Sequence, residues 1–155
     1  MRTKINILDV EIDAVSELKI VEKVDRLIAN SGRGYVTVTG VHGIMESQRS
    51  LLVKAAHDNA WMTVPDGMPL VYIGWLLGEK TIRRCYGPDL MKAIIKHSVS
   101  RGYTHYLFGG GENVAQELCK VLEQQYPGVK IVGTYTPPFR PLSRLEKRNL
   151  LEEVN

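Results

Sequence analysis

Several features that would define a specialised class of protein are missing from this 155-residue chain. It has only two cysteines, Cys85 and Cys119, without CxxC spacing, which excludes a disulfide framework and favours a reducing cytosol. We interpret both as unreactive, partly buried thiols. No apolar run reaches the length of a membrane-spanning helix, and the N-terminal residues lack the apolar stretch of a signal peptide. A membrane-spanning protein and export by that route are therefore not expected.

The chain also lacks a large excess of charge of either sign. It has 20 Lys and Arg and 17 Asp and Glu, for a net charge of +3. No run of five or six basic residues occurs, so a dedicated nucleic-acid-binding protein is not indicated. A weak attraction to anionic lipid or nucleotide stays open. A chain of this length buries roughly 70% of its unfolded surface, so a core forms without disulfides or metals. We expect one globular domain over residues 1–155.

Common catalytic and metal-binding patterns are absent as well. There is no GxSxG motif for a hydrolase nucleophile, and the four histidines lack zinc-ligand spacing. Asp9, Glu11 and Asp13 share one face of an extended segment, which fits either a hard cation or a solvent-facing strand. We predict no metal site.

Hydrophobic periodicity predicts strands that alternate with helices. The predicted strands are residues 4–12, 35–39, 61–64, 104–108 and 129–135. The predicted helices are residues 14–30 with Asp13 as cap, a stretch ending near 58, then 68–78, 88–101, 114–126 and a charged helix from Ser143. This alternation is typical of βαβ units, so we expect an α/β fold with a mainly parallel, Rossmann-like sheet flanked by helices.

A glycine-rich turn, Gly109-Gly110-Gly111, separates a predicted strand from a predicted helix. Backbone N–H groups of such a turn and the helix N-terminus can hold a diphosphate. The turn matches neither GxGxxG nor a Walker loop, because Val114 stands at the third Rossmann glycine and no GK[ST] follows. A nucleotide site and a purely structural tight turn both fit the spacing.

A second turn, Pro65-Asp66-Gly67, places a carboxylate where a strand ends, which is where ligands collect in open α/β sheets. Asp66 is either a general base or the cap of the helix beginning near Met68. Further along, Arg83-Arg84 can offset phosphate charge or form solvated surface. Asp89 fits the first turn of a helix, where it interacts with the helix dipole.

Five segments follow one another along nearly the whole chain. They are VTVTGVHGIMESQR (36–49), TVPDGMPLVYIGWLLG (63–78), RRCYGPDLM (83–91), YLFGGGENVAQEL (106–118) and YPGVKIVGTYTPPFRPL (126–142). In this order and spacing they resemble the WecG/TagA/CpsF family of bacterial glycosyltransferases. The resemblance implies a hexosyl- or N-acetylhexosaminyl-transferase that moves a sugar from a UDP-sugar to a lipid-diphosphate-linked saccharide. The implied transfer is inverting and metal-independent, and it serves cell-surface or exopolysaccharide biosynthesis.

The resemblance also implies roles for individual residues. Asp66 matches the family's proposed general base, and Arg84 matches an arginine that offsets charge on the departing diphosphate. The residues expected to bind substrate are Thr37, Thr39, Gly67 and Asp89. The residues expected beside the nucleotide are Gly109, Gly110, Gly111 and Glu112. The chain departs from the family at Gly40-Val41-His42, where an asparagine often stands.

The partners implied by the resemblance are a UDP-sugar donor and a polyprenyl-diphosphate-linked acceptor, with no cofactor and no nucleic acid. Family members continue into a further glycine-rich segment and a basic appendage linked to membrane association. We therefore expect a chain truncated at its C-terminus, a cytoplasmic location at the inner face of the cell membrane, and either a monomer or a homo-oligomer. Two alternatives stay open, namely an NAD-type nucleotide-binding module and an inactive interaction domain.

Overall fold

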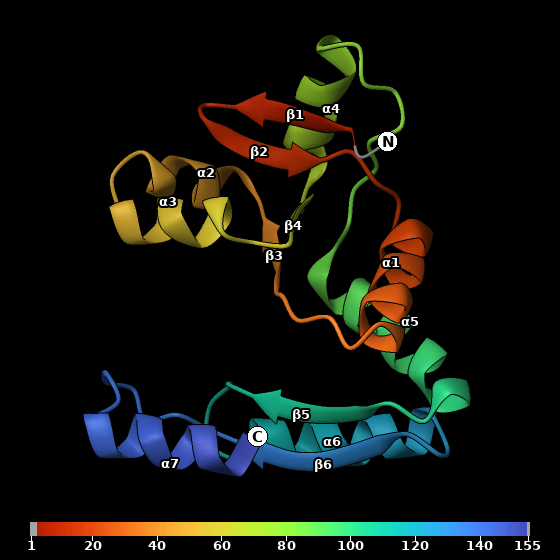
Figure 1. Cartoon of the computed structure of the whole chain (residues 1–155), viewed down its shortest axis with the longest axis vertical. Helices are drawn as coiled ribbons and strands as arrows, with labels where there is room; N and C mark the ends of the chain where they lie inside the picture. The colour runs from red at the N-terminus through yellow and green to blue at the C-terminus, as the bar shows by residue number, and fades with distance from the viewer. Residues whose placement is uncertain (1–2, 155) are drawn as a thin grey trace. The chain divides into compact units, whose positions relative to one another are not determined.

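The computed structural model describes residues 3–154 and shows a mixed α/β protein (Figure 1). Its elements in chain order are β1 (Lys4–Ile7), β2 (Val10–Asp13), α1 (Glu17–Ala29), β3 (Val36–Thr39), α2 (Val41–Ser47), α3 (Leu51–Asp58), β4 (Met62–Pro65), α4 (Met68–Leu76), α5 (Gly87–Arg101), β5 (Thr104–Phe108), α6 (Val114–Gln125), β6 (Lys130–Tyr135) and α7 (Arg144–Val154). The pairs β3/β4 and β5/β6 are parallel and are joined through helices, as in Rossmann-like βαβ units. The predicted α/β class is confirmed.

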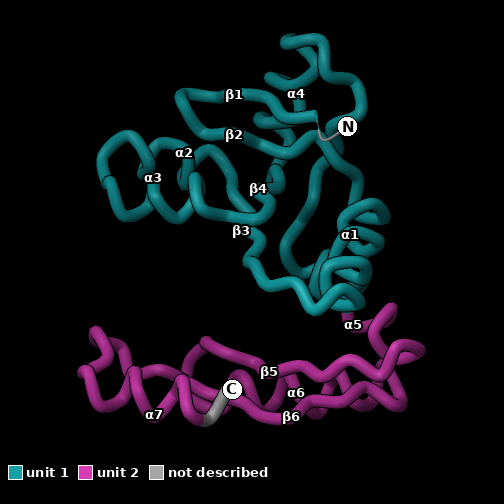
Figure 2. The backbone as a smooth tube through the Cα atoms, in the orientation of Figure 1, with its two compact units in different colours: residues 1–94 teal, residues 95–155 magenta. Residues whose placement is uncertain are grey.

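The chain divides into two compact units, residues 1–94 and 95–155, which are coloured separately in Figure 2. The parallel pair β3/β4 belongs to the first unit, and the parallel pair β5/β6 belongs to the second. A single domain over the whole chain stays a prediction.

The N-terminal segment is a hairpin rather than the single strand predicted over residues 4–12. Strands β1 and β2 pair antiparallel, and Leu8 and Asp9 form the turn with φ of 48° and 60°. The two-residue turn shifts the buried positions from odd residue numbers (Ile5, Ile7) to even ones (Val10, Ile12), and the apolar Leu8 in the turn hides this shift in the sequence. The alternation buries one face of the hairpin, made of Ile5, Ile7, Val10 and Ile12.

The predicted helix cap at Asp13 is wrong. Asp13 lies in β2, is almost fully buried, and its carboxylate accepts a hydrogen bond of 3.0 Å from the backbone N–H of Thr63. Helix α1 begins later, at Glu17 after the N-cap Ser16. The stretch predicted as helical up to residue 58 is two helices, because Ser50 caps α3 by accepting from the N–H of Val53. Asp13 therefore ties β2 to β4 and does not start a helix.

Two hydrophobic clusters form the core of the first unit, and the second of them holds β4 through Met62 and Val64. The cluster between the hairpin and α4, seen side by side in Figure 1, contains Ile5, Ile7, Val10, Ile12, Ala14, Ile44, Leu70, Val71 and Ile82. The second cluster contains Val15, Ile20, Met62, Val64, Cys85 and Leu90. All four residues of β4 are buried, so the chain leaving this strand starts from a fixed position.

In the second unit, α6 packs against the β5/β6 pair (Figure 1). The predicted charged helix is present as α7, and Ser143 caps it in a reciprocal capping box. The Ser143 Oγ accepts from the N–H of Glu146 at 3.2 Å, and the Glu146 carboxylate accepts from the N–H of Ser143 at 2.7 Å. Arg140 donates two further bonds to that carboxylate, at 2.7 and 2.9 Å. The bonds from Arg140 and Ser143 lower the pKa of Glu146 to about 2.

Candidate active site

The candidate active site lies where β3 and β4 end. These strands run parallel in a register that pairs Thr39 with Pro65, so the residues that follow them leave from the same edge. The backbone N–H of Asp66 donates to the carbonyl oxygen of Thr39 at 2.7 Å. Gly40 packs closely here, because a Cβ atom at this position would lie 3.0 Å from the carbonyl oxygen of Asp66. The backbone of Asp66 is thus held by β3 as well as by its own strand.

The side chain of Asp66 does not cap helix α4. The N-cap is Gly67, and no side-chain hydrogen bond caps this helix. The Asp66 carboxylate is half-buried and accepts no hydrogen bond from any side chain or backbone group within residues 3–154. The capping interpretation is wrong, and the carboxylate is available to accept a proton from a bound molecule.

Gly67 provides the turn between β4 and α4. Its φ of 102° and ψ of 151° belong to a region that only glycine adopts readily. We expect Gly67→Ala to cost about 1–3 kcal/mol in the free energy of unfolding, because a Cβ strains this conformation. Urea unfolding checks this. Gly87→Ala serves as the control, since a Cβ there meets only ordinary contact with Val38 at 3.7 Å. Equal losses for the two variants would contradict the argument from strain.

The segment of residues 83–85, which precedes α5, is hydrogen-bonded to the end of β4 and to the residues that follow β2. The backbone N–H of Cys85 donates to the carbonyl oxygen of Pro65 at 2.8 Å, and that of Arg83 donates to Val15 at 3.3 Å. The Cys85 side chain is fully buried. Burial raises its pKa to about 11, with smaller contributions from the charges of Glu17, Asp66 and Asp89. Cys85 is fully rather than partly buried, and its lack of reactivity stays a prediction that the raised pKa supports; Asp66 and Asp89 both act on this one buried group.

The two neighbouring arginines have different surroundings. The guanidinium of Arg83 donates to the carbonyl oxygens of Lys80 and Ile82, at 2.6 and 2.9 Å. The Arg84 side chain is exposed, and its Cζ atom lies 4.9 Å from the ring centroid of Tyr86. A guanidinium over an aromatic face keeps its N–H donors free for an anion. Arg83 therefore stabilises its own loop, whereas Arg84 presents its charge to solvent.

The two predicted threonines lie on the same face of β3. Thr37 Oγ1 donates to Thr63 Oγ1 on the paired strand at 2.8 Å. Thr39 is 5% exposed, and a Cβ atom at Gly43 would lie 2.1 Å from its Oγ1. The Thr39 hydroxyl is thus enclosed by neighbouring chain, whereas the Thr37 hydroxyl is partly buried and bonded to the paired strand. Their predicted contact with substrate, like those of Gly67 and Asp89, stays a prediction.

The predicted nucleotide residues lie together in the second unit. Gly109 and Gly110 have φ of 114° and 81°, and the N–H of Gly109 donates to Tyr135 at 2.9 Å. A cleft of about 420 Å³ opens beside this turn. It is lined by Gly110, Gly111, Glu112, Asn113, Gln116, Thr136, Pro137, Pro138 and Phe139. Thr136 Oγ1 is buried without a hydrogen-bond partner in the described part of the chain, and the Phe139 ring is exposed.

Comparison with known proteins identifies the family. Residues 5–155 match the Glycosyl transferase WecG/TagA/CpsF family. The chain belongs to this family. The match covers the five segments recognised in the sequence and confirms that resemblance.

One curated family relative is an N-acetylglucosaminyldiphosphoundecaprenol N-acetyl-beta-D-mannosaminyltransferase from Bacillus spizizenii. It is 27% identical over 104 residues, which are 67% of this chain and 40% of the relative. The chain thus aligns with about two fifths of the length of this relative. Within residues 3–154, no helix is both long and apolar enough to cross a membrane.

Sequence reasoning missed several contacts that shape this region. The close approach of Gly40 to Asp66 joins residues far apart in the chain, and only the strand register brings them together. The aromatic partner of Arg84 lies two residues away, which the pattern RRCY could have indicated. In the acidic segment that contains Glu11 and Asp13, the Glu11 carboxylate forms an ion pair with Lys4, and the Asp13 carboxylate accepts a hydrogen bond from the N–H of Thr63. Among the described residues, no group of three or more His, Cys, Asp or Glu is arranged to hold a metal.

Proposed function

We propose that this chain transfers a hexosyl or N-acetylhexosaminyl group from a UDP-sugar to a saccharide carried on a polyprenyl diphosphate. Membership of the family supports a glycosyltransferase. The name of the Bacillus spizizenii relative supports an acceptor linked to a lipid diphosphate. The product would be an intermediate in the assembly of a cell-surface polysaccharide, formed at the inner face of the membrane.

The observation that carries the proposal is the Asp66 carboxylate. It is half-buried at the carboxyl edge of two parallel strands, and no group within residues 3–154 donates a hydrogen bond to it. A carboxylate used only for structure would normally be paired at such a position. An unpaired one, held by its backbone, can accept the proton of a substrate hydroxyl.

The proposed step is a single displacement. Asp66 takes the proton of the acceptor hydroxyl while that oxygen forms a bond to the anomeric carbon of the donor. The bond between the anomeric carbon and the diphosphate oxygen breaks, and its electron pair leaves with UDP. Attack from the face opposite the leaving group inverts the anomeric configuration. Arg84 offsets the negative charge that grows on the diphosphate, so the step does not require a metal ion.

Nucleotide recognition is proposed at the glycine turn of the second unit. The N–H groups of Gly110 and Gly111 and the start of α6 can approach a diphosphate, because no side chain stands at these glycines. The buried Thr136 hydroxyl lacks a partner in the described chain and fits a polar group of a ligand in the same cleft.

Calorimetric titration with UDP tests this assignment, with NAD as the comparison ligand. We expect saturable binding of UDP and loss of that binding in Gly111→Leu, whose side chain would enter the cleft. The backbone at Gly111 tolerates a side chain, since a Cβ there meets only Val114 at 3.9 Å. Gln124→Leu, on the exposed surface of α6 and outside the cleft, is the control. Binding of NAD without UDP, or unchanged UDP binding in Gly111→Leu, would contradict the proposal.

A further inference from the structure

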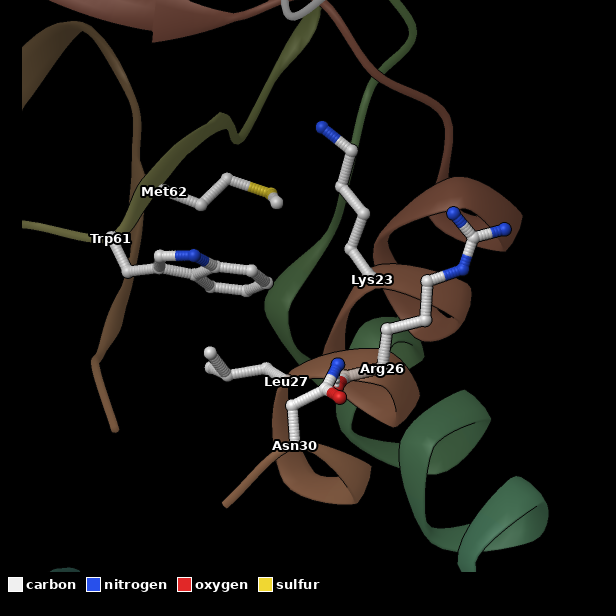
Figure 3. A pocket seen from close by; sticks show the side chains of 6 residues that line it. All are labelled: Lys23, Arg26, Leu27, Asn30, Trp61 and Met62. Carbon is white, nitrogen blue, oxygen red and sulfur yellow. Dashed lines mark hydrogen bonds between the residues drawn. The ribbon is translucent and has the colours of Figure 1, made fainter. Parts of the chain in front are cut away.

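A second pocket lies at the other end of β4, against helix α1 (Figure 3). Its volume is about 310 Å³, and it is lined by Lys23, Arg26, Leu27, Asn30, Trp61 and Met62. Met62 begins β4 and Pro65 ends it, so this pocket and Asp66 lie at opposite ends of one strand. A four-residue strand spans about 13 Å, too far for a group bound here to be the sugar reacting at Asp66.

The polar side of the pocket carries two positive charges without counter-charges. Lys23 and Arg26 lie one turn apart on α1, and neither side chain has an ion-pair or hydrogen-bond partner within residues 3–154. Like charges at this spacing on a helix repel each other. The helix dipole accounts for a cation at Arg26 in the last turn, but not for Lys23 in the middle of α1. A bound anion would relieve the repulsion.

The other side of the pocket is apolar and held in place. The backbone N–H of Trp61 donates to the carbonyl oxygen of Tyr35 at 2.9 Å, and Met62 is 1% exposed. In Figure 3 the indole of Trp61 lies between the side chains of Met62 and Leu27, across from the two cations of α1. The pocket is therefore amphipathic, with cationic groups on one wall and an indole, a thioether and an aliphatic chain on the other.

We propose that this pocket binds a phosphate monoester attached to an apolar body. A phosphate monoester carries more charge than a carboxylate and offers three acceptor oxygens, which suits two cations. Asn30 adds an amide donor, since its Nδ2 uses one hydrogen for the carbonyl oxygen of Arg26 at 2.8 Å. The apolar wall then covers the body of the ligand. Because it uses none of the residues assigned to sugar transfer, this site stands or falls separately from the proposed function.

The chain provides its own fluorescent probe for this site. Its two tryptophans are Trp61 in the pocket and Trp75 in α4, where it is partly buried against the first hydrophobic cluster. Trp75→Phe leaves Trp61 as the only tryptophan, and its emission reports on the pocket. The probe ligand is n-octyl phosphate, and n-octyl glucoside, with the same chain and no charge, is the matched comparison. Inorganic phosphate tests the isolated head group, and vesicles of phosphatidic acid, whose head group is a phosphate monoester, test a lipid surface.

We expect n-octyl phosphate to change the Trp61 emission saturably and n-octyl glucoside to leave it unchanged. Lys23→Gln/Arg26→Gln, in the Trp75→Phe background, should weaken binding by about tenfold or more, because both charged donors are lost. Lys92→Gln/Lys96→Gln removes the same charge from exposed positions of α5 and should bind as the parent does. Circular dichroism confirms that each variant is folded.

The outcomes separate the sources of the phosphate. Inorganic phosphate that displaces n-octyl phosphate, but binds more weakly than it, supports a free phosphomonoester with an apolar body. Binding of vesicles that depends on Lys23 and Arg26, together with binding of n-octyl phosphate, supports a lipid as the source. Equal binding of n-octyl glucoside, equal weakening by both double variants, or vesicle binding without n-octyl phosphate binding would overturn the proposal.

Discussion

Asp66→Asn is expected to lower kcat for sugar transfer by about 10²–10⁴-fold, the range found when a general base is removed. Asparagine keeps the size and shape of the side chain, so the turn before α4 and the fold should be retained. It cannot take the proton of the acceptor hydroxyl, so the attacking oxygen stays a poor nucleophile. The KM values for donor and acceptor should change little, because the lost interaction belongs to the transition state. Initial rates of UDP release, measured with a lipid-diphosphate-linked saccharide, provide the test.

A surface aspartate gives the matched control for this variant. Asp58 is exposed at the end of α3, where it forms an ion pair with Lys54 at 2.5 Å. Asp58→Asn removes the same charge and should keep kcat within about twofold of the parent, as surface substitutions usually do. If Asp66→Asn retains the parental kcat, or if both variants lose activity equally, Asp66 is not the base.

The strands and helices that follow local sequence rules could be predicted. The alternation of strands with helices, the buried strand before Pro65-Asp66-Gly67 and the start of α7 at Ser143 all depend on neighbouring residues. The α/β class followed from the same local patterns.

Features that depend on distant residues could not be predicted. The hairpin could not be told from one strand, because Leu8 in the turn is also apolar and hides the shift of the buried positions from odd to even residue numbers. The sequence predicts a helix cap at Asp13 because an aspartate before a helical pattern usually is one. In the structure its carboxylate instead accepts a hydrogen bond from the N–H of Thr63, which lies fifty positions away in the chain. Tertiary structure outweighed local preference in both cases.

The candidate site shows the same division. The sequence predicts that Asp66 lies at a strand end, but it does not distinguish a general base from a helix N-cap. That choice depended on where helix α4 takes its N-cap, and the positive φ of Gly67 decides it. The pocket on α1 was missed entirely, because Trp61 and Lys23 come from separate elements with no shared motif.

Arg84→Ala is expected to lower kcat by about 10²–10³-fold, the loss seen when one donor to a developing negative charge is removed. The loss should appear in kcat more than in the KM for the donor, because charge grows on the diphosphate as the sugar leaves. Arg84→Lys should recover only part of the rate, since an ammonium lacks the planar fork that meets two phosphate oxygens. Steady-state kinetics across a range of donor concentrations separates the two parameters.

The neighbouring arginine distinguishes this role from a general effect of positive charge. Arg83→Ala removes the same charge one residue earlier, but its guanidinium is bonded to the carbonyl oxygens of Lys80 and Ile82. We expect Arg83→Ala to lower Tm while kcat stays within about twofold of the parent, whereas Arg84→Ala should leave Tm nearly unchanged. Tyr86→Leu should fall between them in kcat, because it removes only the aromatic face that orients Arg84. Equal losses of kcat in Arg83→Ala and Arg84→Ala would show that net charge, and not the position of Arg84, matters for the transfer.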